Sequence, residues 1–372
     1  MPRTTNFILI AAALALQHAA SPAHAAAQAA RQTPAAATAQ TAAVENDDYE
    51  RGRLLLTRGD AAGAAPLLRR AAEARRKDAD PWYHLGLALN RLGKTADARN
   101  AFEKAVRARP DSAAAHASLA YTFLLLGKMR DAEREAERAL ALDAQLAEAH
   151  FVTGTVRFQQ GNFWRAATEA EEALRLNPDF PAAAFLDGDA LLNLYGDETT
   201  RLAGKHPLAA SAGEDERKAV LEKWDAELEP LKARMRETAV RLEGFAAARS
   251  DAAAAERLRE LAGSLRLYAR ARGENHGVYR QAEVGARAVI TFKPEPGFTE
   301  EARRQNVTGR VRLRAVLGAD GRVRNIVPVR RLPGGLTEAC VEAARRIKFT
   351  PATVAGVPVS QFVILEYNFE VR

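Results

Sequence analysis

The sequence predicts an α+β multidomain fold. An α-solenoid of helical hairpins comes first, followed by a small α/β domain with a three-stranded antiparallel sheet and two helices. Two observations carry this prediction: small residues recur with a period of 34 over residues 45–180, and the hydrophobic period changes from about 3.6 to about 2 after residue 285. The composition agrees, because alanine is abundant and aromatics make up 6% of the chain, a mixture that favours helix.

Four registers of small residues define the repeats. They are Gly52, Gly86, Ala120 and Gly154; Gly59, Gly93, Gly127 and Gly161; Ala64, Ala98, Ala132 and Ala166; and Ala71, Ala105, Ala139 and Ala173. Small residues let helices pack closely, and glycine at a helix end adopts a left-handed cap at low cost. We therefore predict four hairpins and a partial fifth, in residues 45–78, 79–112, 113–146, 147–180 and 181–196.

The hairpin at residues 79–112 carries the fullest signature: Trp82, Leu85, Gly86, Leu89, Ala98, Phe102, Ala105 and Pro110. These residues resemble the tetratricopeptide repeat. The other copies depart from it, because the tryptophan position holds Asp48, His116 and His150 and the proline position holds Arg76 and Ala144.

The resemblance implies a superhelix whose concave groove binds an unknown protein or peptide. It places toward that groove Tyr83, Leu87, Asn90, Tyr121, Phe151, Thr155 and Phe158. The alternative is a stack that serves as a spacer or a dimer surface.

Residues 1–25 have the organisation of a secretory signal peptide. Arg3 precedes an apolar run, Phe7 to Leu16, and small residues end at Ala25, where we expect cleavage. The prediction is export to the periplasm, with residues 26–44 as a flexible leader. The alternative is an uncleaved inner-membrane anchor, but a spanning helix needs about 20 apolar residues and this run is shorter.

After a helical connector at residues 197–284, residues 285–372 are expected to form the second domain. The run Gly309 to Val316 alternates apolar and basic residues, which predicts a strand, and Asp320-Gly321 marks a hairpin turn. The remaining elements complete the order α-β-β-α-β: a helix at Thr299–Gln305, a strand at Arg322–Arg330, a helix at Leu336–Ile347 and a strand at Val359–Val371.

The second domain is similar to the C-terminal domain of the TonB family. The matching residues are Pro294, Pro296, Phe298, Glu301, Ala302, Gly309, Val311, Asp320, Gly321, Val323, Phe349, Pro351, Ala352, Gly356, Pro358, Val359 and Phe369. One departure is Phe298-Thr299, where the family usually has Tyr-Pro.

That resemblance implies a partner, an outer-membrane TonB-dependent receptor, whose extended segment pairs beside the last strand. The candidate edge is Phe362, Val363, Ile364, Leu365, Glu366, Tyr367, Asn368, Phe369 and Glu370. By parity, Phe362 and Ile364 point away from the core and are expected to contact the guest segment. Alternatively, the last strand is shielded or pairs with another copy.

Positive charge is concentrated in the second domain, where residues 285–372 hold 15 Lys/Arg against 8 Asp/Glu. A basic sheet face is predicted from Arg310, Arg312, Arg314, Arg322 and Arg324. Its default role is a solvated face that discourages aggregation. The alternative is contact with an anionic cell-wall polymer or an acidic receptor segment. Nucleic acid is not an expected partner of an exported protein.

Motifs for catalysis or cofactor binding are not found in the sequence, so we predict a non-enzymatic protein without cofactor or small-molecule substrate. His116 and His150 share a repeat position but have no third metal ligand. The single Cys340 excludes an intrachain disulfide and is expected to be buried on a helix.

The predicted function is therefore a TonB-like periplasmic adaptor in TonB-dependent transport. The alternatives are a periplasmic scaffold or a cell-wall-associated assembly protein, or, with an uncleaved N-terminus, a membrane-anchored energy transducer.

Overall fold

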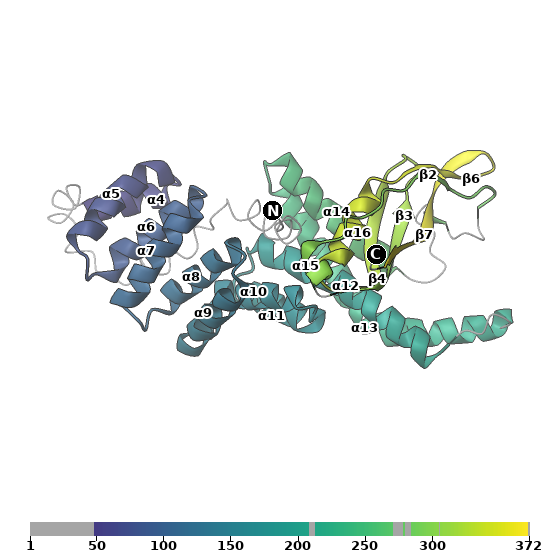
Figure 1. Cartoon of the computed structure of the whole chain (residues 1–372), viewed down its shortest axis with the longest axis horizontal. Helices are drawn as coiled ribbons and strands as arrows, with labels where there is room; N and C mark the ends of the chain where they lie inside the picture. Colours follow the sequence, from purple (N-terminus) through teal and green to yellow (C-terminus); the bar gives the residue numbers. More distant parts are fainter. Residues whose placement is uncertain (1–47, 208–212, 271–277, 280–283, 305, 371–372) are drawn as a thin grey trace. The chain divides into compact units, whose positions relative to one another are not determined.

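The computed structural model describes residues 48–207, 213–270, 278–279, 284–304 and 306–370 (Figure 1). The predicted signal peptide with Ala25 and the leader lie outside the described residues. Within them, every helix is too short or too polar to cross a bilayer. The chain forms two compact units, one ending at Leu186 and the other beginning at Asp187.

The first unit is a series of helical hairpins, drawn in purple to blue in Figure 1. Each second helix packs against its own partner, and the second helices of the first three hairpins also pack against the first helix of the next hairpin. The predicted solenoid is therefore confirmed. Its helices are α4 (Asp48–Thr57), α5 (Ala61–Ala74), α6 (Ala79–Arg91), α7 (Thr95–Ala108), α8 (Ala113–Leu125), α9 (Met129–Leu142), α10 (Ala147–Gln159) and α11 (Phe163–Leu176).

The recurring small residues explain this packing. A Cβ added to Gly86 would lie 2.6 Å from the ring of Phe102, so glycine lets α6 approach α7. Gly93 ends the hairpin's first helix with φ at 70°, a left-handed conformation that costs glycine little. Ala98 and Ala105 are fully buried in α7, where a larger side chain would hold the helices apart.

The second unit begins within α12 (Pro181–Lys205), which starts where the partial fifth hairpin was expected and continues beyond residue 196. α13 (Glu214–Ala247) and α14 (Ala252–Ala269) pack along each other, and Pro230 lies inside α13. A Cβ added to Gly188 of α12 would lie 3.0–3.2 Å from leucine side chains of both helices, so glycine lets the three pack closely.

The sheet of the second unit has the strand order β1-β7-β3-β4, and β6 also pairs with β7. β3 is antiparallel to both β4 and β7, which confirms the predicted three-stranded core. β1 adds to β7 in parallel, and β2 pairs with β5 in a separate ribbon. The bounds are β1 (Val278–Tyr279), β2 (Val289–Phe292), β3 (Gly309–Leu317), β4 (Val323–Arg330), β5 (Lys348–Thr350), β6 (Ala352–Val354) and β7 (Val357–Phe369).

Two helices cover one face of this sheet, α15 (Glu300–Arg304) and α16 (Leu336–Arg345). The core between them and the sheet includes Val311, Leu313 and Cys340, all fully buried. The opposite face meets α12 and α14, so the second unit is a sheet between two layers of helices. The predicted connector therefore contributes helices that pack on the sheet.

Candidate functional site

One side of β7 has no partner among the described strands along most of its length. β3 pairs with β7 from Gln361 to Phe369 on one side. On the other side, β1 occupies Ser360 and Gln361, and β6 pairs with residues 357–359 at the start of β7. From Phe362 to Phe369 none of the described strands pairs with this second side. Backbone donors and acceptors of an open edge can pair with another extended chain.

Lys293 shows which backbone groups face the open side. Its Nζ donates a hydrogen bond to the carbonyl oxygen of Glu366 at 2.5 Å. In an antiparallel strand the N–H and C=O of one residue point to the same side, and the sides alternate along the strand. Ile364 and Asn368 therefore also direct their backbone groups outward. Sequence analysis missed Lys293, although a lysine beside an edge strand is a common protecting feature.

The side chains of the predicted edge alternate between the core face and the opposite face of the sheet. Leu365, Tyr367 and Phe369 are buried in the core. Ile364 is 46% exposed. Phe362 also points away from the core, but its ring lies 6.2 Å from that of Tyr268 in α14. Among the remaining members, Val363 lies toward the core, and Glu366 and Asn368 lie away from it. Glu370 follows the end of β7.

The five predicted arginines of the basic face have different surroundings. Arg310 and Arg312 flank the carboxylate of Glu366, at 3.3 and 2.7 Å. The guanidinium carbon of Arg314 lies 6.0 Å from the ring centroid of Tyr195 in α12. Arg314 is half-buried, so the exposed arginines of this face lie toward the two ends of β3. The remaining two lie at the β3–β4 hairpin: Arg322 and Arg324.

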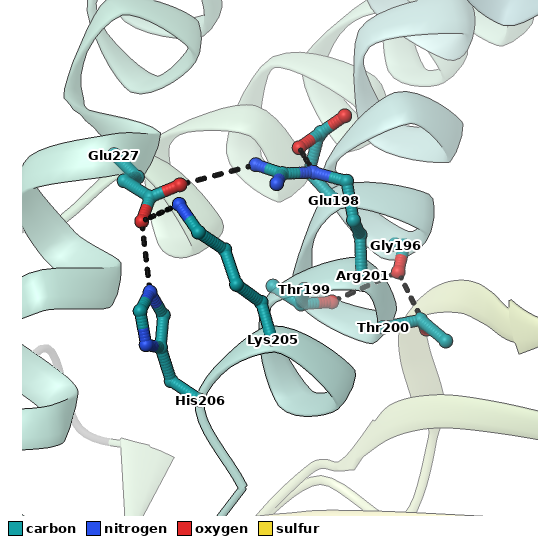
Figure 2. Close-up of polar contacts among 8 residues, drawn as sticks. All are labelled: Gly196, Glu198, Thr199, Thr200, Arg201, Lys205, His206 and Glu227. Atoms are coloured by element: carbon teal, nitrogen blue, oxygen red, sulfur yellow. Dashed lines mark hydrogen bonds and ion pairs between the residues drawn. The ribbon is translucent and has the colours of Figure 1, made fainter.

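Figure 2 shows how α12 approaches the sheet. The carbonyl of Gly196 accepts hydrogen bonds from the hydroxyls of Thr199 and Thr200, both at 2.9 Å. The Thr200 hydroxyl is also 3.0 Å from the carbonyl oxygen of Val329 in β4. A Cβ on Gly196 would lie 2.5 Å from the carbonyl oxygen of Pro328, so this close approach requires glycine.

The same region holds a carboxylate surrounded by cations (Figure 2). Glu227 of α13 accepts hydrogen bonds from Lys205 at 2.9 Å and Arg201 at 3.2 Å, and lies 3.1 Å from Nε2 of His206. Hydrogen bonds from Lys205 and His206 lower the pKa of Glu227 to about 2. Because Arg201 also pairs with Glu198 at 2.7 Å, this cluster joins α12 to α13 and leaves little unbalanced charge.

The predicted repeat-groove residues lie on α6, α8 and α10. Phe151 and Thr155 are buried, and the ring of Phe151 lies 5.1 Å from Phe180. Asn90 donates to the hydroxyl of Thr122 at 2.8 Å. The structure therefore places the predicted groove residues on neighbouring helices. A guest can reach mainly the half-buried ones: Tyr83, Leu87, Asn90, Tyr121 and Phe158.

Two polar atoms of this group lack partners in the described part of the chain. They are Oδ1 of Asn90 and the hydroxyl of Tyr121, both removed from solvent. Burial also raises the pKa of Tyr121, which keeps its hydroxyl protonated and able to donate. A buried polar atom without a partner is costly, so these two atoms are a local cost to the packing of this surface.

His116 and His150 form the same arrangement one repeat apart. Nδ1 of His116 lies 2.8 Å from Glu135, and Nε2 lies 3.0 Å from the Pro110 carbonyl. His150 repeats this with Glu169 and the Ala144 carbonyl at the same two distances. Hydrogen bonding to Glu169 raises the pKa of His150, which favours its imidazolium form. The histidines thus hold hairpins together, and the described residues contain no cluster of three potential metal ligands.

Comparison with protein families agrees with the two resemblances. Residues 294–371 match the family described as the Gram-negative bacterial TonB protein C-terminal. Residues 49–99, 91–147 and 151–219 match the tetratricopeptide repeat. The chain is a tetratricopeptide-repeat protein with a TonB-family C-terminal domain. Both families are non-enzymatic protein-interaction domains, so the TonB-like domain and the repeats support a protein-interaction adaptor.

Several solved structures match part of the chain. A crystal structure of MamA shares 22% identity and covers 45% of this chain and 98% of its own, with a TM-score of 0.35. A thermophilic tetratricopeptide-repeat protein of Thermus thermophilus shares 20% identity over 48% of this chain and 97% of its own, with a TM-score of 0.36. MamA from Desulfovibrio magneticus shares 19% identity over 51% and 97%, with a TM-score of 0.34. No curated protein matches the chain.

Proposed function

We propose that this protein is a periplasmic adaptor whose TonB-like domain binds an extended segment of an outer-membrane TonB-dependent receptor by strand addition at β7. The observation that carries the proposal is the open side of β7, where Ile364, Glu366 and Asn368 direct backbone groups outward. A guest strand would satisfy these groups, and β1 is an instance of a short strand adding to the same side.

The tetratricopeptide repeats would bind a second protein or peptide. The half-buried members of the predicted groove support this part of the proposal, because a guest can reach them: Tyr83, Leu87, Asn90, Tyr121 and Phe158. An extended peptide offers backbone N–H and C=O groups together with side chains to such a surface. The protein would then join two partners without catalysing a reaction.

Periplasmic location is proposed from the N-terminal sequence. Mass spectrometry of the purified protein should find a mature N-terminus after Ala25. An intact Met1 in the membrane fraction would contradict export of a cleaved protein and would favour an inner-membrane anchored energy transducer.

Strand addition is tested by a proline that blocks one edge donor. Ile364→Pro removes an outward N–H, whereas the N–H groups that pair with β3 belong to the neighbouring residues. We expect it to abolish binding of synthetic peptides from receptor N-terminal segments, measured by calorimetry. Proline is tolerated at a strand edge, so β3 pairing should survive. Ile364→Val keeps the N–H and is the matched control.

Two results would overturn the proposal. One is unchanged peptide affinity in Ile364→Pro with an intact fold, checked by circular dichroism. The other is failure of the natural sequence to bind any receptor peptide, which would leave the periplasmic scaffold as the better explanation.

A further inference from the structure

Lys293 occupies the middle of the open β7 edge. Its ammonium donates to the Glu366 carbonyl oxygen at 2.5 Å and lies 4.3 Å from the ring centroid of Tyr367. The first contact takes up a backbone acceptor that strand addition requires. The second is a cation–π contact that holds the ammonium beside the edge. Lys293 itself is exposed, so it can leave without disturbing the core.

A guest strand and Lys293 compete for the same acceptor. In a regular ladder, the N–H of a guest residue would donate to Glu366 where Nζ now donates. A carbonyl oxygen has two lone pairs, but the ammonium lies in the path of the incoming backbone. The guest must therefore displace Lys293, and the displaced cation then needs another acceptor.

The acceptors near this edge are largely engaged. The Glu366 carboxylate is held by Arg310 and Arg312, at 3.3 and 2.7 Å. The domain as a whole carries 15 Lys/Arg against 8 Asp/Glu over residues 285–372. A displaced ammonium therefore lies in a positive field, and a carboxylate on the guest would balance it.

We propose that Lys293 is a displaceable cap on the β7 edge and that the guest segment carries an acidic side chain that receives the released ammonium. The inference rests on the proposed strand addition and adds a specificity rule to it. A neutral segment breaks the hydrogen bond of Lys293 and offers the ammonium no new partner. An acidic segment breaks the same bond but supplies a carboxylate as the new partner.

The test measures two synthetic peptides against three proteins. One probe is an eight-residue alternating Thr/Val peptide, and the other carries Glu at its fourth position. The variant is Lys293→Met, which keeps the length of the side chain and removes its charge. Lys348→Met is the matched control, because Lys348 is an exposed lysine of the same domain on β5.

We expect the natural protein to favour the Glu peptide by about two- to fivefold at low salt. Lys293→Met should bind the Thr/Val peptide about two- to fivefold more tightly than the natural protein does and lose the preference for Glu. Lys348→Met should behave as the natural protein. Added salt should reduce the preference for Glu, because the contact is exposed.

The cap can also be observed without a guest. In Lys293→Met the carbonyl ¹³C resonance of Glu366 should shift, and in Lys348→Met it should not. An unchanged Glu366 resonance, or equal peptide affinities for the two lysine variants, overturns the cap while leaving strand addition intact. If neither probe and no receptor peptide binds any variant, strand addition itself fails and the specificity rule fails with it.

Discussion

A half-buried carboxyl group, Asp189 of α12, makes the stability of the second unit depend on pH. The side-chain amide of Asn193 donates to its main-chain oxygen at 2.6 Å and lies 3.4 Å from Oδ1. Burial raises the pKa of Asp189 to about 6, against the opposing attraction of Arg331 and Arg345. Glu338 of α16 adds a small repulsion. Removing the charge should therefore stabilise this unit.

The magnitude follows from the pKa rise. A change from 3.8 to about 6 corresponds to about 3 kcal/mol at about 1.4 kcal/mol per unit. The folded form binds the proton more tightly than the unfolded form, so the benefit of protonation is complete below about pH 4 and is lost as pH rises through about 6. Asp189→Asn should raise the free energy of opening by up to about 3 kcal/mol at pH 8 and by little at pH 4.

Hydrogen exchange followed by mass spectrometry measures this free energy at the amides of α16, corrected for the intrinsic rate at each pH. Glu256→Gln provides the control for removal of one negative charge, because the Glu256 side chain is 76% exposed. A lower opening free energy of Asp189→Asn at pH 8 would refute the reasoning. It would mean that the attraction of Arg331 and Arg345 outweighs the cost of burying the charge.

Two further predictions concern the repeats. The hydrogen bond from His150 to the Glu169 carboxylate raises the pKa of His150, so α10 should be most protected below about pH 6.5 and lose protection as pH rises further. Replacing His150 and Glu169 by the Trp/Ala pair of repeat 79–112 should remove this pH dependence of exchange, and an unchanged slope would contradict it. Gly86→Ala places a Cβ 2.6 Å from an aromatic ring and should cost about 1–3 kcal/mol in urea unfolding. Gly204→Ala is the control, because a Cβ at Gly204 has open space around it. This substitution should not lower the free energy of unfolding.

The repeats could be predicted from sequence because their contacts are local and periodic. A small residue recurs at the position of Gly86 every 34 residues, because each hairpin needs a close approach of its two helices. A further periodic signal was available: where histidine replaces Trp82, a glutamate stands 19 residues later, as in Glu135 and Glu169. The hydrogen-bonded His–Glu pairs could therefore have been proposed from the sequence.

The features around the β7 edge could not be predicted in the same way, because they depend on contacts between distant segments. The parity of the strand placed Ile364 and Phe362 on one face, but α14 supplies Tyr268 against Phe362 and leaves Ile364 exposed. Lys293 is separated from Glu366 by 73 positions. No local pattern in the sequence encodes that contact, and it also depends on the path of the chain after β2.

The contrast between the two outer strands favours β7 over β4 as the strand that receives a guest. Pro328 lies within β4 and has no N–H to donate, a property that limits pairing at a sheet edge. Helices also engage this strand: Tyr268 donates to the Asn325 carbonyl at 2.6 Å, and Thr200 donates to that of Val329 at 3.0 Å. The β3–β4 register shifts twice, whereas β7 pairs with β3 in unbroken register. A guest strand needs a regular edge with available donors and acceptors, and β7 provides one once Lys293 is displaced.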